Sequence, residues 1–127
     1  MSLTLSLLPG TFTICRLDPE AIIPDWAKAG DFMSITRTGD ELSIVCAGAN
    51  VPEGVKSDRG WRCFKVEGPL DLSLTGVLAS LANPLAEARI NIFALSTFDT
   101  DYLLVKEDKA SRAAEVLIQS GHRLTSR

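Results

Sequence analysis

Residues 74–105, with the sequence LTGVLASLANPLAEARINIFALSTFDTDYLLV, decide the predicted fold. Their first part repeats apolar residues at spacings of three and four, which is typical of one helical face; these residues are Leu74, Val77, Leu78, Leu81, Leu85 and Ala88. Pro84 lies inside this pattern and removes a backbone donor, so we expect the helix to continue with a kink near residues 80–83. Residues 90–97 and 102–105 then predict a hairpin around a turn at 98–101.

The segments on either side extend this pattern. Residues 61–66 predict a strand before the helix, and residues 108–120 predict a second helix after the hairpin. Asp108 is expected to cap this helix and Gly121 to stop it, with a buried face formed by Ala110, Ala113, Ala114, Leu117 and Ile118. With a short final strand at 122–124, the second half reads β-α-β-β-α-β.

The first half predicts a shortened form of the same order. Residues 3–7 and 11–17 alternate as strands, and Asp18-Pro19 begins a helix that Pro24 makes short or broken. Residues 32–38 and 41–47 predict a hairpin at Gly39-Asp40, where glycine would accept a positive φ. Residues 48–60 lack periodicity and predict a loop and linker. The two halves therefore indicate a degenerate internal duplication, and one sheet face would need cover from a second module or subunit.

Composition excludes several classes of protein. The net charge is −3 and no Lys/Arg run is interleaved with aromatic residues, so nucleic acid is not an expected partner. Pro9-Gly10 interrupts the apolar start, which predicts a first strand instead of a signal peptide or membrane span. The odd, widely spaced cysteines, Cys15, Cys46 and Cys63, indicate reduced, buried thiols in a soluble cytoplasmic protein.

Residues 64–70, 76–81 and 84–105 resemble the ACT domain. The likeness is closer to small bacterial tandem-ACT proteins related to the second ACT of aspartate kinases and to the CASTOR arginine sensors. It implies an α+β fold, with a ferredoxin-like βαββαβ module at 60–127 in tandem with a shortened ACT-like half at 1–59, and an antiparallel sheet with helices on one face. Arg89 departs from the family, which commonly has glycine there. The resemblance also implies amino-acid binding between ACT units, side-by-side sheet pairing and usually no catalysis.

A free amino acid needs backbone donors or a cation at its carboxylate end and a carboxylate at its ammonium end. Donors are available where the first long helix begins, at Leu72, Ser73, Leu74, Thr75 and Gly76. Gly76 would let a ligand approach the backbone. The same segment is also consistent with a capped helix whose glycine is needed for packing.

The second candidate segment consists of Thr97, Phe98, Asp99, Thr100 and Asp101. The resemblance places this segment beside the helix start, with Asp101 at the matched position for an ammonium group and Asp99 as a weaker candidate. Taken alone, Asp-Thr-Asp is typical of a turn, because these side chains bond their own backbone. The resemblance favours a binding site.

An enzyme would have to use Cys46 or Cys63 as a nucleophile with His122 as base, but no motif places them together. His122 follows a helix stop and is expected to be a solvated surface residue. A metal site from Asp99, Asp101 and His122 would have poorly spaced, oxygen-rich ligands. We therefore predict no catalytic residue, no metal and no cofactor.

The leading hypothesis is a regulatory amino-acid sensor that forms a homodimer through ACT interfaces and acts on a separate effector protein. Its predicted location is the cytoplasm, without contact to membrane or nucleic acid. The alternative is a structural or protein-interaction ACT module that binds no ligand.

Overall fold

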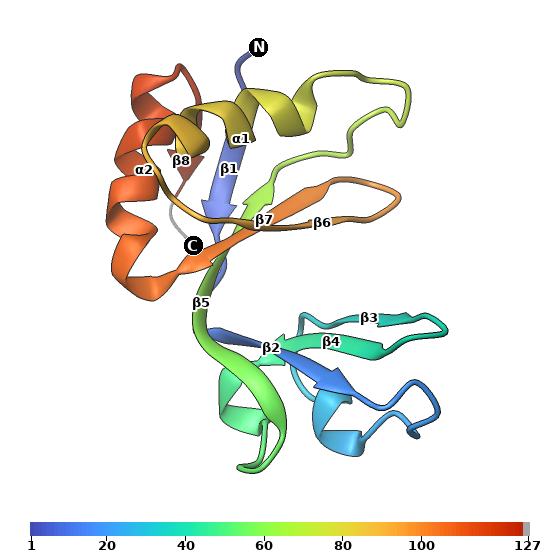
Figure 1. Ribbon diagram of the computed structural model, residues 1–127. Helices are drawn as coiled ribbons and strands as arrows, with labels where there is room; N and C mark the ends of the chain where they lie inside the picture. The colour runs from blue at the N-terminus through green and yellow to red at the C-terminus, as the bar shows by residue number, and fades with distance from the viewer. Residues whose placement is uncertain (126–127) are drawn as a thin grey trace. The chain divides into compact units, whose positions relative to one another are not determined.

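The computed structural model describes residues 1–125 of the chain, and these residues form two compact units (Figure 1). The smaller unit is Gly10–Trp61. The larger unit combines Met1–Pro9 with the chain from Arg62 onward, so the N-terminal segment belongs with the second half of the sequence. Strand β5 (Lys56–Val66) supplies its first part to the smaller unit and its second part to the larger one. No helix in residues 1–125 is long and apolar enough to cross a membrane.

The smaller unit is an antiparallel sheet with the strand order β3-β4-β2-β5. Its other strands are β2 (Phe12–Leu17), β3 (Ser34–Arg37) and β4 (Leu42–Ala47), and its 3-10 helices are η1 (Asp25–Lys28) and η2 (Gly48–Asn50). Alternate residues of β2 and β4 point into one apolar cluster, which contains Cys15, Leu42, Ile44 and Cys46. Numbered along the chain, the four strands lie in the order second, third, first, fourth.

Three predictions for this unit need correction: the helix from Asp18, the positive φ at Gly39 and the extent of the loop at 48–60. The helix expected from Asp18 does not form within residues 18–24: the Asp18 carboxylate accepts the N–H of Glu20 (2.9 Å) and its carbonyl accepts that of Ala21 (3.0 Å), which makes a single turn, and η1 begins only after Pro24. The β3–β4 hairpin forms as predicted, but Gly39 does not adopt a positive φ. The Thr38 hydroxyl instead accepts the N–H groups of Asp40 (3.1 Å) and Glu41 (3.2 Å).

The expected loop at 48–60 is shorter than predicted, because β5 begins at Lys56. Pairing with β2 explains the strand, since Lys56, Ser57 and Asp58 lie opposite Arg16, Cys15 and Ile14. These polar β5 residues carry no apolar alternation, so local periodicity did not reveal the strand. The Arg59 guanidinium closes the remaining loop by donating to the carbonyls of Val51 (2.9 Å) and Pro52 (3.2 Å).

The larger unit contains a five-stranded sheet in the order β6-β7-β5-β1-β8. Its elements are β1 (Thr4–Leu7), α1 (Val77–Glu87), β6 (Phe93–Ser96), β7 (Asp101–Lys106), η3 (Glu107–Lys109), α2 (Ala110–Gln119) and β8 (Arg123–Thr125). Taking β5 as the first strand, β6, β7 and β5 again lie in the order second, third, first, with β1 in the fourth place. Strands β1 and β8 are parallel, unlike the antiparallel pairs β1–β5 and β6–β7. The predicted α+β, ferredoxin-like fold class is confirmed.

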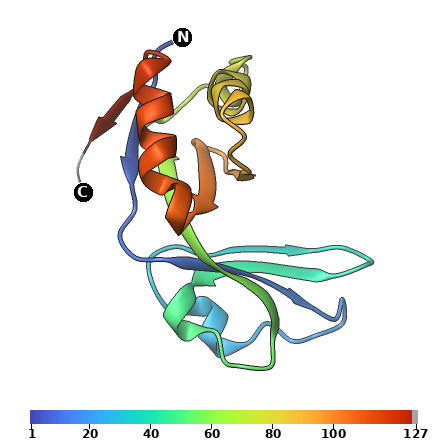
Figure 2. The ribbon, with the colours of Figure 1, turned by 60° about the vertical axis from the view of Figure 1, so that its left-hand side comes forward.

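Helices α1 and α2 contact each other and share one apolar core with the strands (Figure 2). Leu81 and Leu85 of α1 and Leu117 of α2 are fully buried there. Each such side chain stabilises the fold by roughly 1.5–3 kcal/mol relative to an exposed one. The helix continues through Pro84, as the sequence predicts.

The helix ends and faces differ from the prediction in detail. Helix α1 begins at Val77, so Leu74 lies before it, and Leu74 and Leu78 are exposed. The η3 turn precedes α2, which makes Lys109 the residue before the helix and removes the predicted cap at Asp108. Ile118 is 55% exposed, against the expected burial.

His122 was expected on the surface, and this prediction is wrong. The residue is 4% exposed and lies just before β8. Gly121 has a φ of 98° at the end of α2, as a helix stop requires, and the reversal there turns the following imidazole inward.

Candidate functional site

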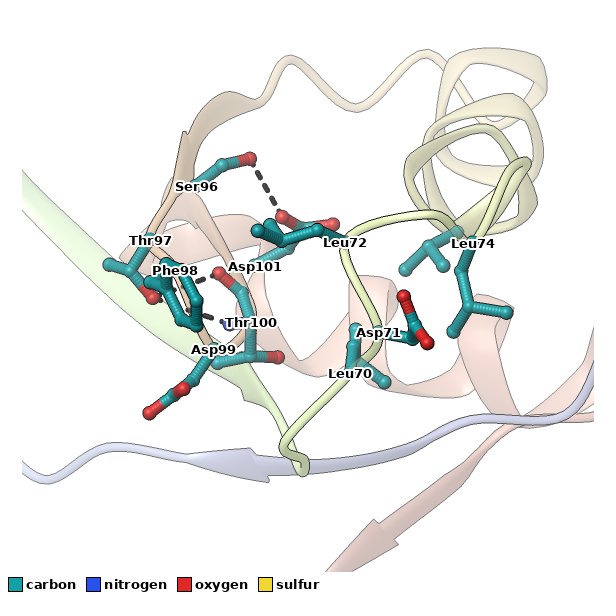
Figure 3. A pocket seen from close by; sticks show the side chains of 11 residues that line it. Leu70, Asp71, Leu72, Leu74, Ser96, Thr97, Phe98, Asp99, Thr100 and Asp101 are labelled. Carbon is teal, nitrogen blue, oxygen red and sulfur yellow. Dashed lines mark hydrogen bonds between the residues drawn. The ribbon is translucent and has the colours of Figure 1, made fainter.

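A cavity of about 210 Å³ opens in the larger unit between the segment leading into α1 and the β6–β7 turn (Figure 3). Its walls are formed by residues 70–72, 74, 77 and 96–101. Sites for drug-sized ligands usually measure about 300–1,000 Å³, so this cavity suits a smaller molecule.

Hydrogen bonds of Thr97 and Thr100 close the β6–β7 turn, and the carboxylates of Asp99 and Asp101 take no part in these bonds. The backbone N–H and hydroxyl of Thr97 both donate to the Thr100 carbonyl (2.8 and 3.1 Å). The buried Thr100 hydroxyl donates to the Val66 carbonyl (2.6 Å), which fixes the turn to β5. Asp99 and Asp101 are therefore not needed to form the turn.

Asp101 is held at the start of β7. It lies directly opposite Ser96 in the β6–β7 ladder, and the Ser96 hydroxyl donates to its carboxylate (2.7 Å). Figure 3 shows the side chain of Leu72 reaching toward this turn, whereas the Asp99 carboxylate points away from the 70–74 segment. Asp101 is half-buried and Asp99 is exposed. Asp101 is thus the better placed of the two carboxylates.

The opposite wall is a tight turn around Asp71. Its carboxylate accepts the backbone N–H and the hydroxyl of Ser73, each at 2.8 Å, and these bonds hold the pKa of Asp71 below its ordinary value. The Asp71 carbonyl also accepts the N–H of Leu74 (3.0 Å). This Asx-type turn carries the chain into α1.

Within residues 1–125, the start of α1 has no side-chain cap. Gly76 precedes the helix with a φ of 78° and has no side chain to bond its first N–H groups. A Cβ on Gly76 would meet nothing within 4 Å, so packing does not require glycine there, but the left-handed backbone favours it. The positive end of the helix dipole therefore borders the cavity wall at Val77.

The structure brings the two predicted segments together, although not every predicted residue lines the cavity. Leu72 and Leu74 face it from one side, and the whole run of residues 97–101 faces it from the other. Ser73, Thr75 and Gly76 lie in the connecting turn and do not line it. The sequence analysis missed Leu70, Asp71, Val77 and Ser96. The Asp-x-Ser spacing at 71–73 was the available signal for Asp71.

Apolar side chains surround the cavity and remain exposed. Phe98 is 79% exposed and Leu72 is 67% exposed, with Leu74 close to half exposed. Each is a large apolar residue on the cavity wall. Such a rim can cover a ligand or contact another protein surface.

The cysteine thiols and the His122 imidazole are the groups that an enzyme would have to use. Burial raises the pKa of Cys63 to about 12 and that of Cys15 to about 11. The two His122 ring nitrogens lie within hydrogen-bond distance of backbone groups, 3.1 Å from Leu3 N and 3.0 Å from Ser80 O. Burial therefore opposes thiolate formation at Cys63 and Cys15. Within residues 1–125, no three His, Cys, Asp or Glu residues are grouped to hold a metal ion.

The larger unit is thus a ferredoxin-like domain with a small cavity beside the start of α1. The profile described as the ACT domain matches residues 56–119, and a second profile, describing an N-terminal domain, matches residues 10–54. The chain belongs to the ACT domain family.

Among related sequences, the human cytosolic arginine sensor for mTORC1 subunit 1 is 41% identical over 58 residues. This match covers 45% of the present chain and 18% of the sensor. The chain thus spans less than a fifth of the length of the curated relatives it matches first.

Two solved structures show how widely the fold recurs. A crystal structure from Agobacterium tumefaciens is 43% identical and has a TM-score of 0.94, covering 100% of this chain and 95% of that one. The regulatory subunit of aspartate kinase from Thermus flavus is 13% identical, with a TM-score of 0.65 and coverage of 94% and 99%. The second likeness concerns the fold alone.

Proposed function

We propose that this protein is a regulatory module that binds a free amino acid in the cavity between residues 70–77 and 96–101. The observation that carries the proposal is the position of Asp101, half-buried on the cavity wall and oriented by the Ser96 hydroxyl. An ammonium group that leaves water needs such a fixed carboxylate. The similarity to an arginine sensor supports the same class of ligand.

The two ends of the ligand would meet different walls. Asp101 takes the ammonium group, and the uncapped N–H groups at the start of α1 receive the carboxylate. Leu72, Leu74 and Phe98 of the cavity wall would contact the carbon skeleton.

The charge of the cavity favours a cationic amino acid. Three acidic residues, Asp71, Asp99 and Asp101, belong to its lining, and no Lys or Arg among the described residues does. A second positive charge on the ligand would be attracted by this wall, whereas an acidic side chain would be repelled. Arginine and lysine are therefore the first ligands to test.

A regulatory role requires assembly, and we propose that two copies pair through their ACT units in the cytoplasm. Both units have the strand order second, third, first, which supports a tandem of a shortened ACT-like half and an ACT domain. Of the half expected at 1–59, residues 1–9 belong to the larger unit, together with the domain expected at 60–127. Buried thiols with raised pKa values fit a reducing compartment. Output would pass to a separate effector protein that distinguishes the free and liganded forms.

A thermal-shift screen against the twenty amino acids tests the proposal. A ligand that binds the native state at a hundred times its Kd adds about 2.7 kcal/mol, which for a domain of this size raises Tm by several degrees. We expect the largest shifts from arginine or lysine, and none from glutamate or aspartate at equal concentration. A uniform absence of shifts up to millimolar ligand would contradict amino-acid binding.

The second candidate is an interaction module without a small ligand, which the exposure of Phe98 and Leu72 favours. In that case a partner protein would cover the rim and the cavity would stay unused. Phe98→Ser would then abolish partner binding, while no amino acid changed the Tm of either form.

A further inference from the structure

His122 joins three separate parts of the larger unit. Its ring lies after α2, its Nδ1 is 3.1 Å from the backbone nitrogen of Leu3, and its Nε2 is 3.0 Å from the carbonyl oxygen of Ser80. Leu3 leads into β1 and Ser80 belongs to the first turn of α1. The residue is 4% exposed, so water does not compete freely for these bonds.

The bond to Ser80 compensates for a gap in the helix. In an α-helix, each carbonyl accepts the N–H of the residue four positions later. For Ser80 that residue is Pro84, which has no N–H. The helix therefore leaves the Ser80 carbonyl without its usual donor, and His122 Nε2 lies at the distance at which an N–H replaces it.

These two partners determine which ring nitrogen carries the hydrogen. A backbone N–H can only donate, so Nδ1 must accept from Leu3; a carbonyl can only accept, so Nε2 must carry the hydrogen. The neutral ring with the proton on Nε2 satisfies both bonds. A second proton on Nδ1 would place two N–H groups against each other and break the bond to Leu3.

We propose that His122 is a staple that holds the N-terminal segment to α1 in one tautomer, with its Nε2–H group replacing the donor that Pro84 lacks. Ser80 lies one helical turn after Val77, and Val77 lines the cavity. The staple thus also positions one wall of the candidate site, whether or not a ligand binds there.

No charged side chain substitutes for the two backbone partners. Within residues 1–125, none of the charged groups on the surrounding elements forms a hydrogen bond or ion pair with the ring. These groups are the Met1 ammonium before β1, Glu87 of α1, Arg112 and Glu115 of α2 and Arg123 of β8. The ring is therefore positioned by its two backbone contacts.

The chain contains a single histidine, which makes the test direct. Long-range proton–nitrogen NMR spectra of the native protein should show one neutral imidazole with its proton on Nε2. Urea unfolding then compares His122→Gln, whose side chain keeps one donor and one acceptor, with His122→Leu, which keeps neither. The unfolding constant of His122→Leu should exceed that of His122→Gln roughly tenfold, because the Leu3 N–H and the Ser80 carbonyl lose their partners.

Two results would overturn the proposal. One is a proton on Nδ1 in the native protein. The other is an equal unfolding constant for His122→Gln and His122→Leu. If a variant does not fold, the NMR spectrum of the wild type still decides, because the proposal requires the Nε2–H form.

Discussion

The backbone N–H of Leu70 donates to the carbonyl of Asp99 at 2.7 Å, and this bond joins the two walls of the candidate site. Gly68 makes the approach possible. A Cβ at that position would meet Leu70 N at 2.9 Å and Asp99 O at 3.3 Å, and both atoms belong to the backbone, which cannot rotate away. The contact therefore depends on the absence of a side chain two residues before Leu70.

We expect Gly68→Ala to lower the free energy of unfolding by about 1–3 kcal/mol, as overpacking does in other tight contacts. Gly39→Ala is the matched control, because Gly39 has no positive φ and a Cβ there meets nothing within 4 Å. Urea unfolding of both variants measures the difference. Equal stability of the two would show that the 68–70 segment yields without cost.

Arg89 occupies a backbone position that favours glycine. Its φ is 61°, while its N–H and that of Ile90 bond the carbonyls of Ala86 and Leu85 (2.9 Å each) and so end α1. A residue with a side chain adopts this conformation at a cost of roughly 1–2 kcal/mol. Glycine avoids that cost, but its greater freedom in the unfolded chain offsets part of the gain in stability.

Arg89→Gly should therefore raise the free energy of unfolding by up to ~1 kcal/mol. Arg89→Ala keeps the strained conformation and should show no such gain. Thermal or urea unfolding compares the two variants, and a glycine variant no more stable than the alanine variant would argue against strain at this turn.

The buried thiol of Cys63 should make the protein less stable at alkaline pH. Burial raises its pKa from the ordinary 9.0 to about 12, so the native state keeps a proton that the unfolded chain loses. Its contribution is complete below about pH 9 and is lost as the pH rises from there toward 12. Between about pH 8 and about pH 10, the unfolding constant of the wild type should rise roughly tenfold more than that of Cys63→Ala. Parallel pH profiles would refute this assignment.

Assembly gives a further prediction. Strands β6 and β8 end the sheet of the larger unit, and exposed apolar residues surround the cavity beside β6. Open edges of this kind are usually covered, so light scattering at micromolar concentration should return about twice the monomer mass of 13.7 kDa. A mass equal to the monomer value would contradict pairing of ACT units.

Local pattern was sufficient where neighbours in sequence decide the structure. The spacing of Leu81 and Leu85 predicted α1, and residues 90–97 and 102–105 predicted the β6–β7 hairpin. Asp101, which was expected in the turn, instead begins β7 opposite Ser96. The Leu70–Asp99 bond could not be predicted in this way, since it joins loops 29 positions apart in the numbering.

The errors have the same origin. His122 has a surface-like sequence context after Gly121, but its partners Leu3 and Ser80 are 119 and 42 residues away. The first residues of β5 are polar, and they form a strand because they pair with β2. Tertiary backbone contacts, which periodicity does not encode, decided both cases.

The central prediction for the site concerns Asp101. A charge-assisted hydrogen bond to a partly buried ammonium group contributes about 1.5–3 kcal/mol. Asp101→Asn should therefore weaken binding of the best amino acid by roughly ten- to a hundredfold, measured by calorimetric titration. Asn keeps the shape and can still accept from Ser96, so the free energy of unfolding should change much less than the binding free energy.

Asp99→Asn is the matched control, because Asp99 lines the same cavity but its side chain points away from the 70–74 segment. It should change the Kd only slightly, through the loss of a nearby negative charge. If Asp101 serves only the hairpin, the pattern reverses: Asp101→Asn lowers the Tm through its bond with Ser96 while the Kd of the best ligand stays constant. Equal dissociation constants for the wild type and Asp101→Asn would exclude Asp101 as the ammonium-binding residue.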